Sequence, residues 1–148
     1  MLIKLRSWLM VTLLLMILSW VVGLREARCA DPWSPQLTPG AATGETNVCV
    51  KGFARTHRER VRPTLARALR YQYHVGPSEA ITFDHLIPVE LGGASVEQNI
   101  WPEDRAEAKQ KDVVENRMKR AVCAGRVPLA RAQLCFTKNW RTCEELIR

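Results

Sequence analysis

Residues 81–101 read Ile-Thr-Phe-Asp-His-Leu-Ile-Pro-Val-Glu-Leu-Gly-Gly-Ala-Ser-Val-Glu-Gln-Asn-Ile-Trp, and this stretch decides the expected fold. Residues 81–87 alternate in polarity and favour β structure, which is typical of a strand. Gly92 and Gly93 indicate a loop. Residues 99–101 then read as a short returning strand that ends before Pro102. The pattern predicts a two-stranded hairpin.

Helical patterns lie on both sides of this hairpin. The longest covers residues 103–123, with acidic residues in its first turns, basic residues in its last turn and Gly125 beyond it. Shorter helices are expected across residues 63–74 and 128–135. The tail after Asn139 has no clear pattern. The sequence therefore predicts an α+β fold, a hairpin-plus-helix unit with additional flanking helices.

The first residues read as a targeting segment. Two basic residues precede residues 7–24, which carry no charge, and this is the layout of a secretory signal. Residues 1–30 are therefore expected to be a signal peptide or an uncleaved signal anchor, residues 31–46 a linker, and residues 47–148 one domain. We expect a periplasmic or secreted protein, with anchoring in the inner membrane as the alternative.

The chain is basic, with 22 Lys and Arg residues against 15 Asp and Glu residues. The excess is greatest in residues 51–70, which hold seven cations and one anion, Glu59. Such a block attracts polyanions by releasing condensed counterions, although a solvated face is an equally good interpretation. If the block binds nucleic acid, Arg55, Arg58 and Arg62 are the expected contacts. No small-molecule cofactor is expected.

Four cysteines lie outside the targeting segment, an even number that suits an oxidising compartment. They are Cys49, Cys123, Cys135 and Cys143. Four cysteines allow three full pairings, and we expect Cys49 to pair with Cys123 because these two flank the hairpin-plus-helix unit. No Cys-x-x-Cys pair is present, so a structural zinc site is not expected.

The residue order around Asp84 and His85 resembles that of the HNH endonuclease family, also called ββα-metal or His-Me finger nucleases. The shared features are the Asp-His doublet, Pro88 three residues later, paired glycines, Asn99 fourteen residues after the histidine, and a following helix. This resemblance covers residues 83–115. It implies a ββα-metal unit, formed by the hairpin and the helix after it.

A longer phrase extends the resemblance over most of residues 47–140. It reads Asp-His-Leu-Ile-Pro-Val-Glu-Leu-Gly-Gly in the middle, with Cys-Val-Lys-Gly from Cys49 and Val-Cys-Ala-Gly from Val122. It is similar to a group of small exported bacterial HNH-like proteins. This second resemblance strengthens the expected fold more than the expected function.

The resemblance implies a role for each of three residues. His85 is expected to be the general base, because an imidazole that titrates near neutral pH can take a proton from the attacking water. Asp84, on the other side of the strand, is expected to hold a metal ion, and Asn99 to fix the loop by hydrogen bonds. The alternatives are an ordinary capped turn with a surface histidine, and a loop amide.

The helix departs from the family pattern, because no histidine follows Asn99 in the chain. Helical spacing places one stripe of side chains toward the hairpin. The stripe consists of Glu107, Lys111, Val114, Met118 and Ala121. Glu107 is therefore the expected replacement metal ligand, and Lys111 an expected nucleic-acid contact. An exposed i,i+4 pair between Glu107 and Lys111 is the alternative.

Two other acids are weaker candidates for the metal site. Asp112 lies off the stripe and is the second choice on the helix, while Glu90 could join from the loop. Oxygen ligands of this kind favour Mg²⁺ or Mn²⁺ over zinc. Of the remaining residues, His57 and His74 are expected to be structural.

The tryptophans Trp101 and Trp140 could stack on bases, but Trp101 is expected in the core. These patterns together predict an exported, metal-dependent endonuclease that acts on DNA, with RNA as the alternative substrate. Low sequence preference is expected, because the chain has no separate module to read bases. An exported nucleic-acid-binding protein with an inactive HNH scaffold, or a structural envelope protein, would fit the same charge pattern. The resemblance favours the nuclease.

Overall fold

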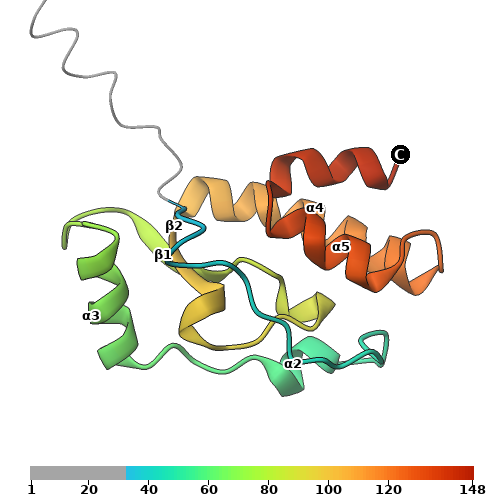
Figure 1. Cartoon of the computed structure of the whole chain (residues 1–148), viewed down its shortest axis with the longest axis horizontal. Helices are drawn as coiled ribbons and strands as arrows, with labels where there is room; N and C mark the ends of the chain where they lie inside the picture. Colours follow the sequence, from blue (N-terminus) through green and yellow to red (C-terminus); the bar gives the residue numbers. More distant parts are fainter. Residues whose placement is uncertain (1–32) are drawn as a thin grey trace, which may run out of the picture. The chain divides into compact units, whose positions relative to one another are not determined.

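The computed structural model describes residues 33–148, which mix helices with one small antiparallel sheet, as in an α+β protein (Figure 1). Residues 32–148 form one compact unit. The signal segment expected at residues 1–30 lies outside the described residues. Within residues 33–148, no helix is both long enough and apolar enough to cross a membrane.

The sheet is a hairpin of β1 (Ile81–His85) and β2 (Ile100–Asp104). Ile81 pairs with Asp104, and His85 pairs with Ile100 at the other end. The returning strand is longer than expected, because it continues through Pro102. Proline is tolerated there because a two-stranded sheet leaves one edge of each strand without partners.

Helix α4 (Arg105–Cys123) begins after β2, two residues later than the sequence predicts. The reason is Asp104, whose carboxylate accepts hydrogen bonds from the amides of Ala106 (2.7 Å) and Glu107 (3.2 Å). A carboxylate in this position caps the free amides of the first turn and also suits the helix dipole. The strand therefore runs directly into the helix.

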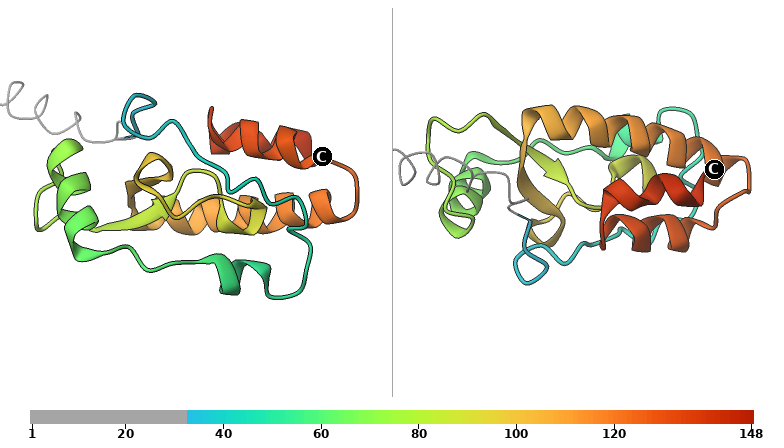
Figure 2. Two further views of the ribbon diagram at one scale, coloured as in Figure 1. Left: turned by 60° about the horizontal axis from the view of Figure 1, so that its bottom comes forward. Right: turned by 90° about the horizontal axis from the view of Figure 1, so that it is seen from above.

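Two apolar clusters pack on this unit. Helix α3 (Pro63–Gln72) contributes Leu69 to a cluster with residues of the hairpin. At the other end, α4 packs against α5 (Leu129–Phe136) and the 3₁₀-helix η3 (Trp140–Leu146). Figure 2 shows the hairpin lying between α3 and the α5–η3 pair. The tail, which has no clear sequence pattern, is thus part of the second cluster.

Residues 33–46, the described part of the linker expected at residues 31–46, pack on the hairpin loop. Thr38 is fully buried, and its hydroxyl lies 2.5 Å from the Tyr73 hydroxyl. The Gly40 amide donates to the Gln98 carbonyl, and Ala42 forms a β-bridge with Gly93. A segment rich in Pro, Gly and Thr can pack in this way when the loop supplies partners for its backbone.

Both disulfides lie within the described residues. Cys49 is bonded to Cys123, as predicted, and joins the segment before α2 (Phe53–His57) to the end of α4. The second links Cys135 in α5 to Cys143 in η3. Structural disulfides persist in oxidising compartments, so the two bonds are compatible with an exported protein.

Candidate active site

Asn99 holds the loop that joins the two strands. Its buried side chain uses all of its hydrogen-bonding capacity. The Oδ1 atom accepts from the amides of Ile87 at 2.9 Å and Ala41 at 3.2 Å. The Nδ2 atom donates to the carbonyls of Ile87 and Ala94, both at 3.0 Å. Asn99 therefore holds Ile87, Ala94 and Ala41 together, which fixes the shape of the loop.

Gly93 is required by a close backbone contact in the same loop. Its amide donates to the Pro88 carbonyl at 2.9 Å. A Cβ atom added to Gly93 would lie 1.8 Å from the Ile87 carbonyl oxygen, a distance that no side chain can occupy. The neighbouring Gly92 has a positive φ of 80°, which glycine adopts without strain. The paired glycines therefore let the loop fold back on itself beside β1.

His85 is the last residue of β1, and only 7% of its surface is exposed. Its Nε2 atom lies 3.0 Å from Ser95 Oγ, which also accepts a hydrogen bond from the Glu59 amide at 3.3 Å. Burial lowers the pKa of His85, and the charge of Arg58 lowers it further, although Asp84 acts in the opposite direction. The ring is therefore neutral at pH 7, which is the form that accepts a proton.

Lys111 is fully buried under the hairpin. Its ammonium group donates to Asp84 Oδ2 at 2.6 Å, to the His85 carbonyl at 2.7 Å and to Glu115 Oε1 at 2.5 Å. Burial lowers the pKa of Lys111, but the carboxylates of Glu115 and Asp84 raise it more, so the group stays charged. A side chain without exposed surface cannot reach a phosphate, which corrects the expectation that Lys111 contacts nucleic acid.

Glu103 lies on the same face of the hairpin as Asp84. Both of its carboxyl oxygens are buried and have no hydrogen-bond partner within residues 33–148. Burial, followed by the proximity of the Asp84 carboxylate, raises the pKa of Glu103 to about 9. Glu103 is therefore neutral at pH 7. Burial raises the pKa of Asp84, but Lys111 and Glu103 outweigh it, and Asp84 stays ionised.

Glu107 lies away from this cluster. Its carboxylate pairs with Arg141 of η3, and each side chain is 38% exposed. Two roles were expected for Glu107, a metal ligand beside Asp84 or an ion pair with Lys111. The position of Glu107 matches neither role. The helix is responsible, because Glu107 lies in the first turn after the Asp104 cap. That turn faces η3, whereas the next turn brings Lys111 under the hairpin.

The residues present do not form the ligand set expected for Mg²⁺ or Mn²⁺. In residues 33–148, no three side chains of His, Cys, Asp or Glu lie close enough together to hold a metal ion. Asp84 already gives Oδ2 to Lys111. Burial and the negative charge of Asp84 raise the pKa of Asp112, which places this second-choice ligand within electrostatic reach of Asp84.

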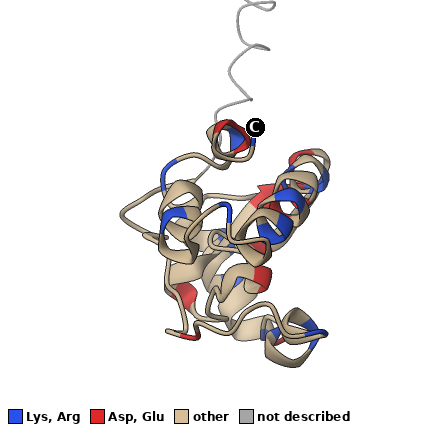
Figure 3. Cartoon of the chain, turned by 90° about the vertical axis from the view of Figure 1, so that its right-hand side faces the viewer, with Lys and Arg blue, Asp and Glu red and all other residues tan. Residues whose placement is uncertain are grey.

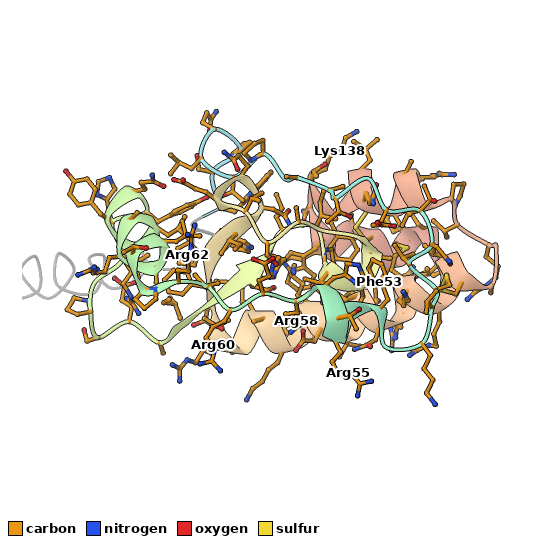
Figure 4. All side chains as sticks on the ribbon, turned by 90° about the horizontal axis from the view of Figure 1, so that it is seen from below. Phe53, Arg55, Arg58, Arg60, Arg62 and Lys138 are labelled. Carbon is orange, nitrogen blue, oxygen red and sulfur yellow. A yellow bond between two sulfur atoms is a disulfide. The ribbon has the colours of Figure 1, made fainter. Side chains whose placement is uncertain are left out.

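The basic segment, residues 51–70, borders the His85 side of the loop. Six of its seven cations are exposed, namely Lys51, Arg55, Arg58, Arg60, Arg62 and Arg67. Arg58 forms an ion pair with Glu90 at 2.8 Å, and its side chain remains 58% exposed. Figure 4 shows Arg55, Arg58, Arg60 and Arg62 along one side of the molecule, with Lys138 on the opposite side. The segment therefore presents its guanidinium groups to solvent.

A second basic surface lies near the end of α4. Four arginines line a pocket of about 320 Å³ together with Glu144 and Ile147: they are Arg117, Arg120, Arg126 and Arg148. Glu144 neutralises Arg117 at 2.5 Å. Elsewhere, cations and anions are interleaved along the helices (Figure 3). The sequence did not indicate this pocket, because its arginines are dispersed among other residues.

The remaining histidines and tryptophans take structural positions. The His57 ring stacks on Phe53 with ring centroids 4.0 Å apart, and its Nδ1 atom lies 2.8 Å from the Phe53 carbonyl oxygen. His74 follows α3 with a positive φ of 53°. Trp101 is fully buried, as the sequence predicts, and Trp140 is also buried, which keeps both from stacking on bases.

Four residues of the site were not singled out from the sequence: Ser95, Glu103, Glu115 and Glu59. Ser95 and Glu59 gave no signal as site residues, because the contact of Ser95 with His85 and that of the Glu59 amide with Ser95 depend on the loop's fold. Glu115 follows Lys111 by four residues, and this spacing could have indicated an ion pair. Glu103 was assigned to the helix, which hid its place on the strand.

Comparisons with protein-family models, curated proteins and solved structures found no match to this chain.

Proposed function

We propose that this protein hydrolyses phosphodiester bonds of nucleic acid, with His85 as the general base, in the manner of an HNH-type nuclease. The observation that carries the proposal is the setting of His85. A neutral imidazole is held at the end of a strand, beside an ionised carboxylate and near an exposed arginine. Perturbed titratable groups in such a setting are typical of catalytic sites.

The contact between His85 and Ser95 indicates which ring nitrogen would accept the proton. Ser95 Oγ has two acceptor positions, so it can accept from the Glu59 amide and from His85 Nε2–H together. We assign this tautomer, which leaves the lone pair of Nδ1 to take a proton from water. Asp84 would then favour the imidazolium that forms, since its negative charge raises the pKa of His85.

Phosphodiester hydrolysis also needs positive charge near the phosphate. Arg58 is the candidate on this side of the molecule, because its exposed guanidinium lies within electrostatic reach of His85. A divalent ion, when bound, would supply charge to the leaving oxygen. Lys111 already holds Asp84 Oδ2, so the proposed steps use only side chains of the protein, and the cleavage assay compares Mg²⁺, Mn²⁺ and chelator directly.

The proposed substrate is DNA, with RNA as the alternative. Exposed arginines of the basic segment suit the phosphate backbone, which every sequence shares, so the cleavage would have little sequence preference.

The two disulfides support action outside the cytoplasm, in the periplasm or as a secreted enzyme. Cell fractionation with thiol labelling tests the location: cytoplasmic protein with reduced cysteines would contradict it.

The test is cleavage of a supercoiled plasmid by the purified protein, with Mg²⁺, with Mn²⁺ and with chelator. His85→Ala should lower the cleavage rate about a hundredfold to ten-thousandfold, because it removes the proton acceptor. Its DNA affinity should persist, since the basic segment is unchanged. The matched control is His74→Asn, in which an exposed histidine is replaced by a residue that tolerates its positive φ. Equal rates for wild type and His85→Ala would contradict the assignment.

A second candidate function is nucleic-acid binding without cleavage. It is favoured by one observation, namely that Lys111 occupies Asp84 Oδ2, the atom expected to bind the metal ion. The same plasmid assay separates the two functions. Salt-dependent DNA binding without cleavage, in Mg²⁺, Mn²⁺ and chelator alike, would favour this second function.

A further inference from the structure

One cation is built into the protein where the sequence predicts a metal ion. The Lys111 ammonium has three hydrogens, and each is donated to an oxygen: one of Asp84, one of His85 and one of Glu115. Two carboxylates and a carbonyl are the kind of oxygen ligands that a hard divalent ion would take. Here these oxygens surround the Nζ atom of Lys111, which belongs to the protein itself.

These contacts join parts of the fold that are distant in sequence. Asp84 and His85 belong to β1, and they lie 27 and 26 residues before Lys111 in α4. Glu115 lies one turn further along the same helix. A metal ion shared by a strand and a helix would hold the two together, and the ammonium group makes the same connection.

The surroundings of Lys111 leave it no contact with water. Its side chain has no exposed surface, and Nζ lies 5.9 Å from the centre of the Phe136 ring. Mg²⁺ in proteins usually keeps several of its water ligands. A dry position under the hairpin therefore suits a lysine, whose three donors are satisfied by the protein.

We propose that the Lys111 ammonium replaces the divalent metal ion as the bridge between the β1–β2 hairpin and α4. Buried carboxylates need a compensating charge, and Lys111 supplies it without a bound ion. The folded state should therefore be independent of metal. This inference holds whether or not the protein cleaves nucleic acid, so its test does not depend on the proposed activity.

The first test is thermal unfolding of the wild-type protein, followed by circular dichroism, with chelator and with Mn²⁺. Unfolding midpoints that agree within the error of the measurement are expected. A midpoint that falls on chelation and recovers when Mn²⁺ is added would overturn the proposal, because it would show that a metal ion supports the fold.

The second test changes the cation. Lys111→Met keeps much of the side-chain volume but leaves two carboxylates uncompensated, so the folding equilibrium constant should fall by roughly a hundredfold or more. Lys109→Met is the control, because Lys109 is exposed on the same helix. Equal stability of the two variants in urea unfolding would overturn the proposal.

A triple variant separates loss of charge from loss of packing. Lys111→Met combined with Asp84→Asn and Glu115→Gln removes the uncompensated carboxylates along with the cation. Its unfolding midpoint in urea should recover most of what Lys111→Met alone has lost. A triple variant no more stable than Lys111→Met would overturn the charge-bridge explanation, and the chelation test on wild type applies even if Lys111→Met does not fold.

Discussion

At the scale of single residues, the site is a set of charges arranged around one buried ammonium. Asp84, Glu103 and Glu115 come from three different positions on the hairpin and helix, and all face Lys111. One ammonium cannot neutralise three carboxylates. The cluster resolves this by holding a proton on Glu103, whose buried oxygens have no hydrogen-bond partner within residues 33–148.

This arrangement predicts a pH dependence of stability for Glu103. Its pKa is about 9 in the folded protein and 4.5 as the unperturbed value. The folded state therefore binds this proton more tightly than the unfolded state does. The protonated Glu103 contributes its full stabilisation below about pH 4.5, and this stabilisation is lost as the pH rises to about 9. Across this window we expect wild type to lose roughly a few kcal/mol of unfolding free energy.

Glu103→Gln tests that prediction, because glutamine has nearly the same shape as glutamic acid and cannot ionise. Its unfolding free energy, measured in urea between pH 5 and about 9, should vary less than that of wild type. Glu145→Gln, at an exposed position, is the control and should follow the wild-type profile. Parallel profiles for wild type and Glu103→Gln would show that Glu103 is not the buried acid.

At the scale of elements, the loop between β1 and β2 is shaped by its backbone. Asn99 forms three side-chain hydrogen bonds with it and a fourth with Ala41, and Gly93 lets the chain pass against the Ile87 carbonyl. This loop also carries Ser95 to the His85 ring. The position of the proposed base therefore depends on residues that have no part in the chemistry.

Gly93→Ala should destabilise the protein by about 3 kcal/mol or more, since the added methyl group would overlap backbone atoms. Gly76→Ala is the matched control, because a Cβ atom there meets only the flexible end of Glu79. Urea unfolding of the two variants measures the difference. If Gly93→Ala were as stable as Gly76→Ala, the loop would not be as tightly packed as described.

The hairpin and the three longest helices follow from local patterns, which the sequence contains. The Cys49–Cys123 bond spans 74 residues, and its prediction came from the position of the two cysteines on either side of the hairpin-plus-helix unit. The start of α4 was wrong by two residues, because Glu103 and Asp104 suit a first helical turn as well as a strand and a cap. That error concealed Glu103. Helical spacing predicts that the Lys111 side chain points toward the hairpin, but it does not predict how deeply that side chain is buried. The burial of Lys111 was therefore not predicted.

At the scale of the whole molecule, positive charge gathers on two surfaces of the described residues, 33–148. The basic segment borders the proposed base, and the arginine pocket lies near the end of α4. The sequence predicted the first because its cations are clustered within twenty residues. It could not predict the second, which forms only when α4 and η3 pack together.

The basic segment should determine DNA affinity. Changing Arg60 and Arg62 to glutamine should weaken binding and lower the slope of log affinity against log salt by up to about 2, close to 0.9 for each lost phosphate contact. Lys138→Gln on the opposite side is the single-charge control (Figure 4). Fluorescence anisotropy over a range of salt concentrations measures the slope. Slopes equal to that of wild type would exclude the segment as the interface.

The central claim is that the His85 imidazole takes the proton from water, and chemical rescue tests it most directly. The measurement is the rate of plasmid cleavage by His85→Ala as imidazole is added. Free imidazole should enter the space left by the ring and restore a measurable part of the lost rate, while leaving wild type unchanged. A His85→Ala variant that cleaves as fast as wild type, with or without imidazole, would contradict the account.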